Sequence, residues 1–263
     1  MDNLKQAIAS RQVILFVGAG VSMNLGLPSW EDLMRKMGED LGFPPDEFIR
    51  LGNYLALAEY YRVRKGGLGD LVRWMDATWH AGGEALGDSA VHRLIVELDF
   101  PMIYTTNYDR WLERAFDHYQ RPYVKIVSVH DLLQLHPGVT QIVKYHGDFD
   151  DETSLTVNET SFFDRLEFES PLDIKLRADC LARSVLFIGY SLSDINLRLL
   201  FYRLSQLWRR YGTGEPPCSY LFSPRGNPVQ KTVLAQWGIT MVSPDKENAQ
   251  DALIDFLSSL RLG

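Results

Sequence analysis

Four short motifs in the sequence hold residue types that can bind a phosphorylated ligand or move a proton. The first is the turn Gly18, Ala19, Gly20, which follows the apolar run VILFV and precedes Ser22. Glycines lack a Cβ atom, so backbone N–H groups can approach a pyrophosphate, and the Ser22 hydroxyl adds a donor. A tight turn without a ligand is the competing interpretation, but the longer string GAGVSMNLGLP favours a nucleotide-binding loop.

The second motif, YTTNYDR at residues 104–110, places polar side chains directly after another apolar run. An Asn side chain both donates and accepts hydrogen bonds, so Asn107 can hold a ribose hydroxyl and a water molecule at once. Asp109 keeps two open interpretations, as a ligand-binding carboxylate and as the cap of the following helix.

The third motif, KYHGD at residues 144–148, offers a candidate base. An imidazole titrates near neutrality and can take a proton from a hydroxyl or from water. Gly147 would let a ligand approach His146 closely. A lone histidine is usually structural, and that interpretation is kept for the other five: His80, His92, His118, His130 and His136.

The fourth motif, GYSLSD at residues 189–194, follows one more apolar run and opens a helical segment. Gly189, Ser191 and Ser193 can present backbone and hydroxyl donors to a phosphate or a ribose. Helix capping alone is the alternative for Ser193 and Asp194. We therefore count Gly189 and Ser191 among the candidate ligand-binding residues.

The apolar patterning predicts a scaffold that brings these motifs together. Short runs rich in β-branched and aromatic residues lack polar alternation, as buried parallel strands do, and helical periodicity fills most intervals. This indicates an α/β fold with a doubly wound, mostly parallel, Rossmann-like sheet, whose carboxyl strand ends would carry the motifs. The predicted strands are 13–17, 102–105, 124–127, 142–145, 185–188, 220–222 and 239–242. The predicted helices are 30–41, 51–63, 90–98, 110–118, 171–183, 196–209, 229–236 and 249–260.

The interval between the first two strands is unusually long. About 84 residues separate them, and they read as helix or loop, so we predict a single domain over residues 1–263 with a helical insertion at about 30–99. An ordinary dinucleotide-binding unit has a second strand after the first helix, ending in an acidic residue that holds the ribose. Its absence here argues against a dehydrogenase.

The amino-acid composition argues against several kinds of binding partner and site. The chain carries 27 basic and 34 acidic residues, a net charge of -7, which disfavours direct nucleic-acid binding. Cys180 and Cys218 are isolated, so neither a disulfide framework nor a zinc site is expected. We expect no signal peptide and no membrane span, and hence a cytoplasmic protein.

In their order along the chain, GAGVS with GLP, TTNYD, HG and GYSLSD resemble the motifs of the sirtuin family. The similarity is greatest to a bacterial sirtuin-like branch of anti-phage defence systems, whose members hydrolyse NAD. The resemblance implies that Gly18, Ala19, Gly20, Ser22, Asp109, Gly189 and Ser191 bind NAD. It also implies that Asn107 orients ribose and water and that His146 is the base. Trp30 and Glu31 replace the family's usual Phe–Arg, and the four-cysteine zinc module of protein-deacylating members is missing.

The implied activity is cleavage of the nicotinamide–ribose bond of NAD, with no cofactor beyond this substrate. A protein deacylase or ADP-ribosyltransferase using the same site stays open, as do a silent NAD or ADP-ribose sensor and an assembly subunit. Unrestricted NAD cleavage would harm the host cell. We therefore expect control by homo-oligomerisation or by a protein partner, such as an ATPase or a nucleic-acid-guided sensor.

Overall fold

The computed structural model describes residues 1–44, 46–80, 86–167, 169–192, 194–212, 214, 216–244 and 246–261. Its centre is a seven-stranded sheet in the order β3-β4-β2-β1-β5-β6-β7, and every pair of neighbouring strands is parallel. The predicted doubly wound, Rossmann-like fold is therefore confirmed. The strands are β1 (Val13–Val17), β2 (Met102–Thr105), β3 (Tyr123–Ile126), β4 (Thr140–Lys144), β5 (Ser184–Ile188), β6 (Ser219–Phe222) and β7 (Ile239–Val242).

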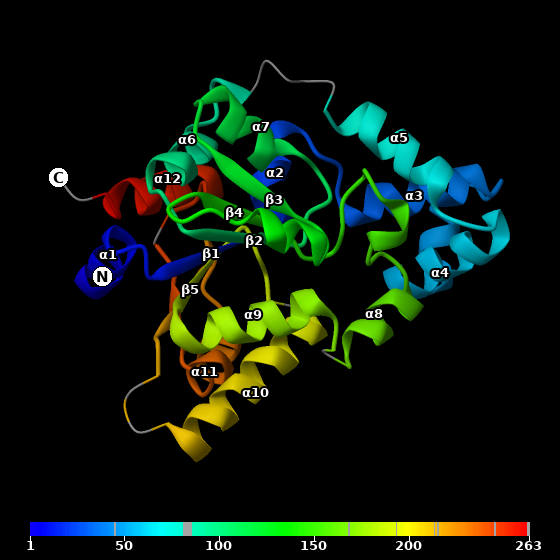
Figure 1. The fold of residues 1–263 in the computed structure, drawn as a ribbon. Helices are drawn as coiled ribbons and strands as arrows, with labels where there is room; N and C mark the ends of the chain where they lie inside the picture. The colour runs from blue at the N-terminus through cyan, green and yellow to red at the C-terminus, as the bar shows by residue number, and fades with distance from the viewer. Residues whose placement is uncertain are drawn as a thin grey trace.

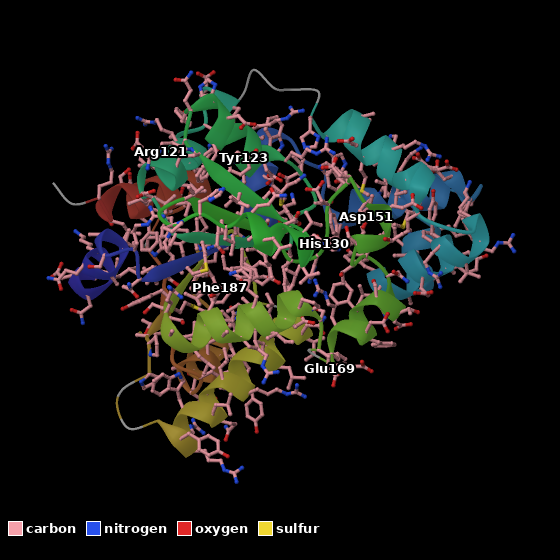
Figure 2. All side chains as sticks on the ribbon, viewed as in Figure 1. Arg121, Tyr123, His130, Asp151, Glu169 and Phe187 are labelled. Carbon is pink, nitrogen blue, oxygen red and sulfur yellow. The ribbon has the colours of Figure 1, made fainter. Side chains whose placement is uncertain are left out.

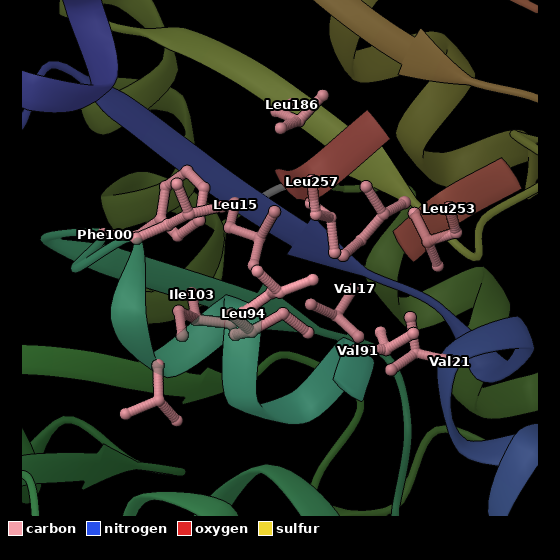
Figure 3. Packing of buried hydrophobic residues seen from close by; sticks show 14 of the residues in the cluster. Leu15, Val17, Val21, Val91, Leu94, Phe100, Ile103, Leu186, Leu253 and Leu257 are labelled. Atoms are coloured by element: carbon pink, nitrogen blue, oxygen red, sulfur yellow. The ribbon is translucent and has the colours of Figure 1, made fainter. Parts of the chain in front are cut away.

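The two faces of the sheet are covered by different helices (Figure 1). All five residues of β1 are buried, because side chains that alternate along the strand enter two separate cores. Leu15 and Val17 pack with α1 (Asp2–Ala9), α6 (Ala90–Glu97), α7 (Trp111–His118) and α12 (Ala249–Ser259), as Figure 3 shows in part. Ile14 and Phe16 pack with α9 (Pro171–Ala182), α10 (Ile195–Tyr211) and α11 (Pro228–Ala235).

The middle of the long interval between β1 and β2 forms a third packing unit beside the sheet. Its helices are α3 (Trp30–Asp40), α4 (Tyr54–Lys65) and α5 (Gly69–Trp79), which share a core with the loop after β4. The interval begins with the short helix α2 (Ala19–Ser22), whose Val21 packs in the first core with α6. The short helix α8 (Glu159–Arg165) joins this unit, since Glu59 of α4 accepts hydrogen bonds from Asn158 and from the amide of Thr160 at 3.0 Å. Figure 1 shows α3, α4 and α5 grouped on one side of the molecule.

Sheet order explains why distant motifs meet. The motifs follow β1, β2, β4 and β5, and these strands are adjacent in the order β4-β2-β1-β5. Because the strands are parallel, all four carboxyl ends lie at one edge of the sheet, the usual ligand-binding edge of such folds.

Charged side-chain ends project outward from the surrounding helices (Figure 2). Among the described residues, no helix has the length and apolar character needed to cross a membrane.

Candidate active site

A cavity of about 540 Å³ lies at this edge of the sheet. Its volume falls within the range of roughly 300–1,000 Å³ that is typical of small-molecule sites. The four motifs and the helical insertion line it together. Its lining residues are Ala19, Met23, Leu27, Pro28, Ser29, Trp30, Leu33, Tyr54, Leu55, Trp79, Thr106, Asn107, Tyr108, Asp109, His146, Phe162, Gly189, Tyr190, Ser191, Asp194 and Ile195.

Asn107 is held in the cavity wall by contacts on both its backbone and its side chain. Its Nδ2 donates to Ser22 Oγ at 3.2 Å, and its backbone N–H donates to Thr105 Oγ1 at 3.0 Å. The Thr105 hydroxyl in turn donates to the carbonyl oxygen of Val17 at 2.9 Å. The amide oxygen of Asn107 is therefore the side-chain atom left to accept a hydrogen bond from a ligand. Ser22 is buried and lies behind Asn107 instead of in the cavity lining.

The structure shows one of the two interpretations that the sequence leaves open for Asp109. Its Oδ1 accepts the backbone N–H of Trp111 at 3.0 Å, which caps the start of α7. The residue also lines the cavity, although its side chain is buried. The capping contact is therefore present, and ligand binding by Asp109 stays a prediction.

His146 is buried in the cavity wall with an aromatic surround. Its ring stacks on Tyr145 at a centroid distance of 5.5 Å and meets Phe162 edge-on at 5.3 Å. Burial, helped by the positive charge of Arg165, lowers the pKa of His146 to about 3. The imidazole is therefore neutral near pH 7, and burial takes its pKa well below the near-neutral value that is expected of a histidine from sequence. Its Nε2 is buried, forms no hydrogen bond within the described part of the chain, and lies 3.6 Å from Asp194 Oδ2.

The glycines of the first motif are needed for contact between two loops. The N–H of Gly18 donates to the carbonyl oxygen of Ile188 at 3.0 Å, and that of Gly20 donates to Gly189 at 2.9 Å. A Cβ on Gly18 would lie 2.4 Å from the Gly189 oxygen. Of the three turn residues, only Ala19 lines the cavity. Pyrophosphate binding by this turn stays a prediction, and both glycine amides already have partners.

The loop after β5 completes the wall. Gly189 and Ser191 both line the cavity, and Gly189 adopts a φ of 59°, a conformation that side chains rarely accept. Asp194 caps α10, because its Oδ1 accepts the N–H of Asn196 at 2.8 Å. The capping contact is thus present for Asp194, which also lines the cavity. Ser193 lies outside the described residues.

Gly147 is required by protein packing. Its φ is 92°, and a Cβ there would lie 2.4 Å from the carbonyl oxygen of Ser154. The sequence interpretation, close approach of a ligand, is therefore not the constraint that the structure displays. The glycine instead lets the loop after His146 fold against the loop at 151–155.

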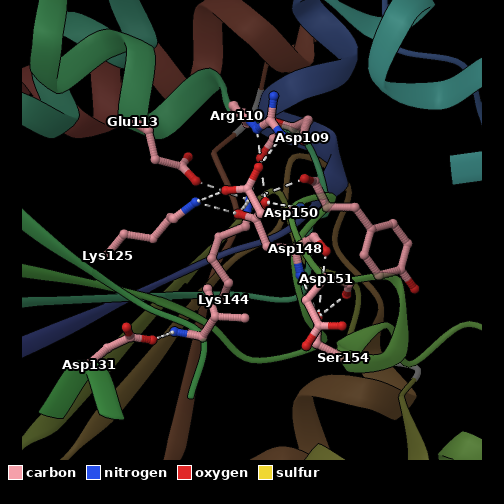
Figure 4. A network of polar contacts seen from close by, with 12 residues as sticks. Asp109, Arg110, Glu113, Lys125, Asp131, Lys144, Asp148, Asp150, Asp151 and Ser154 are labelled. Carbon is pink, nitrogen blue, oxygen red and sulfur yellow. Dashed lines mark hydrogen bonds and ion pairs between the residues drawn. The ribbon is translucent and has the colours of Figure 1, made fainter. Parts of the chain in front are cut away.

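A buried ionic network supports the site from behind, and sequence analysis does not predict it (Figure 4). Lys144 is 0% exposed, and its Nζ donates to the carbonyl oxygens of Tyr108, at 3.3 Å, and Asp109. The same Nζ lies 3.3 Å from Glu113 Oε1 and 3.9 Å from Asp148 Oδ2. Burial raises the pKa of Glu113. Lys144 thereby ties the loop that carries Asn107 to the strand that precedes His146.

The helical insertion contributes an aromatic wall that no motif indicated. Trp30 comes from α3, Tyr54 from α4 and Trp79 from the end of α5, and all three line the cavity. The sequence shows aromatic residues in amphipathic segments, a pattern that equally suits a core. Within the described ranges, no group of three or more His, Cys, Asp or Glu residues is placed to hold a metal ion.

Family comparison agrees with this geometry. The sequence model of the SIR2-like domain family matches residues 101–242, that is, 142 of the 263 residues. The matched segment runs from just before β2 to the end of β7. The chain belongs to the SIR2-like domain family. The resemblance of the motifs to sirtuins is therefore confirmed.

Several curated relatives of this SIR2-like domain carry functional names. It is 31% identical over 201 residues to the NAD(+) hydrolase ThsA of Enterococcus faecium, covering 75% of this chain and 41% of that protein. It is 30% identical over 211 residues to the ThsA of Cytobacillus dafuensis, covering 79% of this chain and 41% of that one. Defense-associated sirtuin 2 of Bacillus subtilis is 24% identical over 212 residues, which are 76% of this chain and 20% of that protein.

The SIR2-like domain thus spans about two fifths of the length of the ThsA relatives. A solved Sir2 homologue in complex with NAD is similar over 99% of this chain and 93% of that one, with a TM-score of 0.49 and 13% identity. The fold class follows from the sheet order, independently of this likeness.

Proposed function

We propose that the chain hydrolyses NAD to nicotinamide and ADP-ribose in the cavity described above. The observation that carries the proposal is that an oriented Asn107 amide and a neutral, buried His146 line the same cavity. The names of the ThsA relatives support NAD as the substrate. The carboxylate of Asp109, which lines the cavity, suits the positive nicotinamide ring.

The chemistry requires one base and no acid. The scissile bond joins a cationic pyridinium to ribose C1′, so nicotinamide leaves as a neutral molecule when it takes the bonding electron pair. The transition state should resemble an oxocarbenium ion, as in other glycosidic cleavages. Asn107 would hold the attacking water and a ribose hydroxyl through its free amide oxygen. His146 would accept the proton that is released, with both groups held in position by the fold.

The sequence also bears on the deacylase alternative. Protein-deacylating sirtuins carry a four-cysteine zinc module, whereas this chain has only Cys180 and Cys218. Hydrolysis needs a water molecule as acceptor and no peptide-binding module. This difference supports the hydrolase over the deacylase.

The direct test is nicotinamide release by the purified chain, measured by liquid chromatography with NAD as substrate. We expect Asn107→Ala and His146→Ala each to lower the rate by about 10²-fold or more, the usual contribution of a positioned base or polar group. Asn3→Ala and His136→Ala are matched controls, since both residues are exposed and neither lines the cavity. Release that is insensitive to both cavity variants would refute the mechanism.

We also propose that the cleavage depletes NAD during anti-phage defence. The name of Defense-associated sirtuin 2 supports this setting. Control by homo-oligomerisation or by a partner protein, an ATPase or a nucleic-acid-guided sensor, stays a prediction. Measuring nicotinamide release across protein concentrations tests control by homo-oligomerisation, because activation by self-assembly requires a specific activity that rises with concentration.

A further inference from the structure

Asp194 lies beside His146, and the mechanism above gives it no role. Its side chain is 10% exposed, and its Oδ2 lies 3.6 Å from Nε2 of His146. The same oxygen accepts a hydrogen bond from the Tyr190 hydroxyl at 3.2 Å, while Oδ1 accepts the N–H of Asn196 at 2.8 Å. The carboxylate is therefore fixed in position by contacts on both oxygens.

Other ionisable groups near this pair do not replace Asp194 as the counter-charge. Arg165 is the nearby cation, and it is engaged by Asp173 at 3.0 Å and lies 4.3 Å from the centre of the Tyr145 ring. Its charge disfavours protonation of His146. Three tyrosine hydroxyls among the described residues also interact with Asp194, and burial raises the pKa of each: Tyr108, Tyr145 and Tyr190. Burial raises the pKa of Asp194 as well.

The separation of 3.6 Å is too long for a hydrogen bond, so the neutral imidazole gains little from Asp194. Protonation changes this, because both ring nitrogens of an imidazolium carry hydrogen, whichever one receives the proton. The Nε2–H then faces a fixed carboxylate and forms a charge-assisted contact. Catalytic hydrogen bonds are often long in the unliganded state and shorten in the complex. An interaction that appears only after proton transfer lowers the barrier without tightening substrate binding.

We propose that Asp194 is a positioning residue that stabilises the His146 imidazolium during NAD cleavage. The inference rests on the proposed hydrolysis. The water oxygen forms the bond to ribose C1′, and the C1′–nitrogen bond breaks with its electron pair passing to nicotinamide. The water proton passes to His146 and later to solvent. Asp194 holds the ring in place and balances the charge that it gains.

Asp194→Asn tests this role with little structural change, because Asn is an equally good helix N-cap and keeps the shape of the side chain. We expect kcat for nicotinamide release to fall about 10²-fold, with KM unchanged within about twofold. The acidic limb of the kcat profile should move to lower pH by about one unit or more, since the imidazolium loses its counter-charge. Loss of the cap alone would not move this limb.

Asp151→Asn is the matched control, because Asp151 also caps a helical turn, with its Oδ1 accepting the Thr153 N–H at 3.0 Å, and it lies outside the cavity lining. It should leave both kcat and the pH profile unchanged. An Asp194→Asn enzyme with normal kcat, or with reduced kcat and an unmoved acidic limb, would overturn the inference while the proposed hydrolysis stands. No nicotinamide release by the wild type would overturn both.

Discussion

Acidification should destabilise the folded chain, because His92 is buried in its neutral form. Its side chain is 0% exposed, and burial lowers its pKa from 6.5 to about 4. Well above pH 6.5 neither the folded nor the unfolded state binds the proton. As the pH falls from 6.5 towards 4, the unfolded chain binds a proton that the folded chain refuses, so the free energy of unfolding decreases. These pKa values give a loss of about 2 kcal/mol at pH 5 relative to pH 8, and about 3 kcal/mol in total.

Urea unfolding followed by circular dichroism at pH 8 and pH 5 measures this loss. The change His92→Leu removes the titrating group, so the pH-induced loss should be about 2 kcal/mol smaller in the variant. It should not vanish, because burial also lowers the pKa of His80 and His146. His136→Gln, at an exposed position, should leave the loss unchanged. Equal losses in the wild type and the His92→Leu variant would refute the reasoning.

Two further predictions test the contacts between loops. Ser22→Ala removes the oxygen that accepts a hydrogen bond from Asn107 Nδ2 at 3.2 Å. We expect the rate of nicotinamide release to fall about tenfold and the free energy of unfolding to fall by about 1–3 kcal/mol. Unchanged release would show that Ser22 does not orient Asn107. Gly18→Ala places a Cβ 2.4 Å from the Gly189 oxygen and should cost about 1–3 kcal/mol in urea unfolding. Gly67→Ala is its control, since a Cβ there meets nothing within 4 Å, and equal losses in the two variants would contradict the packing argument.

The strands could be predicted from sequence because buried parallel strands are apolar on both faces. Three predicted strands coincide with β1, β2 and β7, and the other four overlap the observed strands with small shifts at their ends. The start of β4 differs from the predicted strand for a physical reason. Thr140 reads as a loop residue, yet it is buried with its hydroxyl donating to the carbonyl oxygen of Phe100 at 2.9 Å. A buried polar side chain that has its hydrogen-bond partner cannot be recognised from the local sequence pattern alone.

Helix boundaries were harder to predict than strands. The helix predicted from residue 51 begins at Tyr54, because the Asn53 side chain accepts the N–H of Ala56 at 3.0 Å. Helix α5 was not predicted, since it starts inside the glycine-rich string GGLGD, and α1 carries only Leu4 and Ile8 as buried residues. Tertiary packing stabilises these segments where their local signals are weak.

The candidate residues could be placed at one sheet edge from sequence, but their contacts could not. Asn107 and Ser22 lie 85 positions apart, and nothing in either motif indicates that they form a hydrogen bond. The burial of Lys144 at the end of β4 cannot be predicted either, because its partners come from the turn and helix after β2. Such pairings depend on strand order and register, which single-sequence patterns do not fix.

The four motif loops are tied to one another in the same order as their strands, and this bears on how the site should respond to substitution. Contacts join β4 to β2, β2 to β1 and β1 to β5, and a fourth pair links the loops of β4 and β5 at the cavity. These ties are Lys144 to Asp109, Asn107 to Ser22, Gly20 to Gly189, and His146 to Asp194. Each loop therefore contacts two others, so the geometry of His146 and Asn107 depends on the whole sheet edge. Substitutions in the glycine turn should consequently lower stability and turnover together, whether or not its amides contact the pyrophosphate.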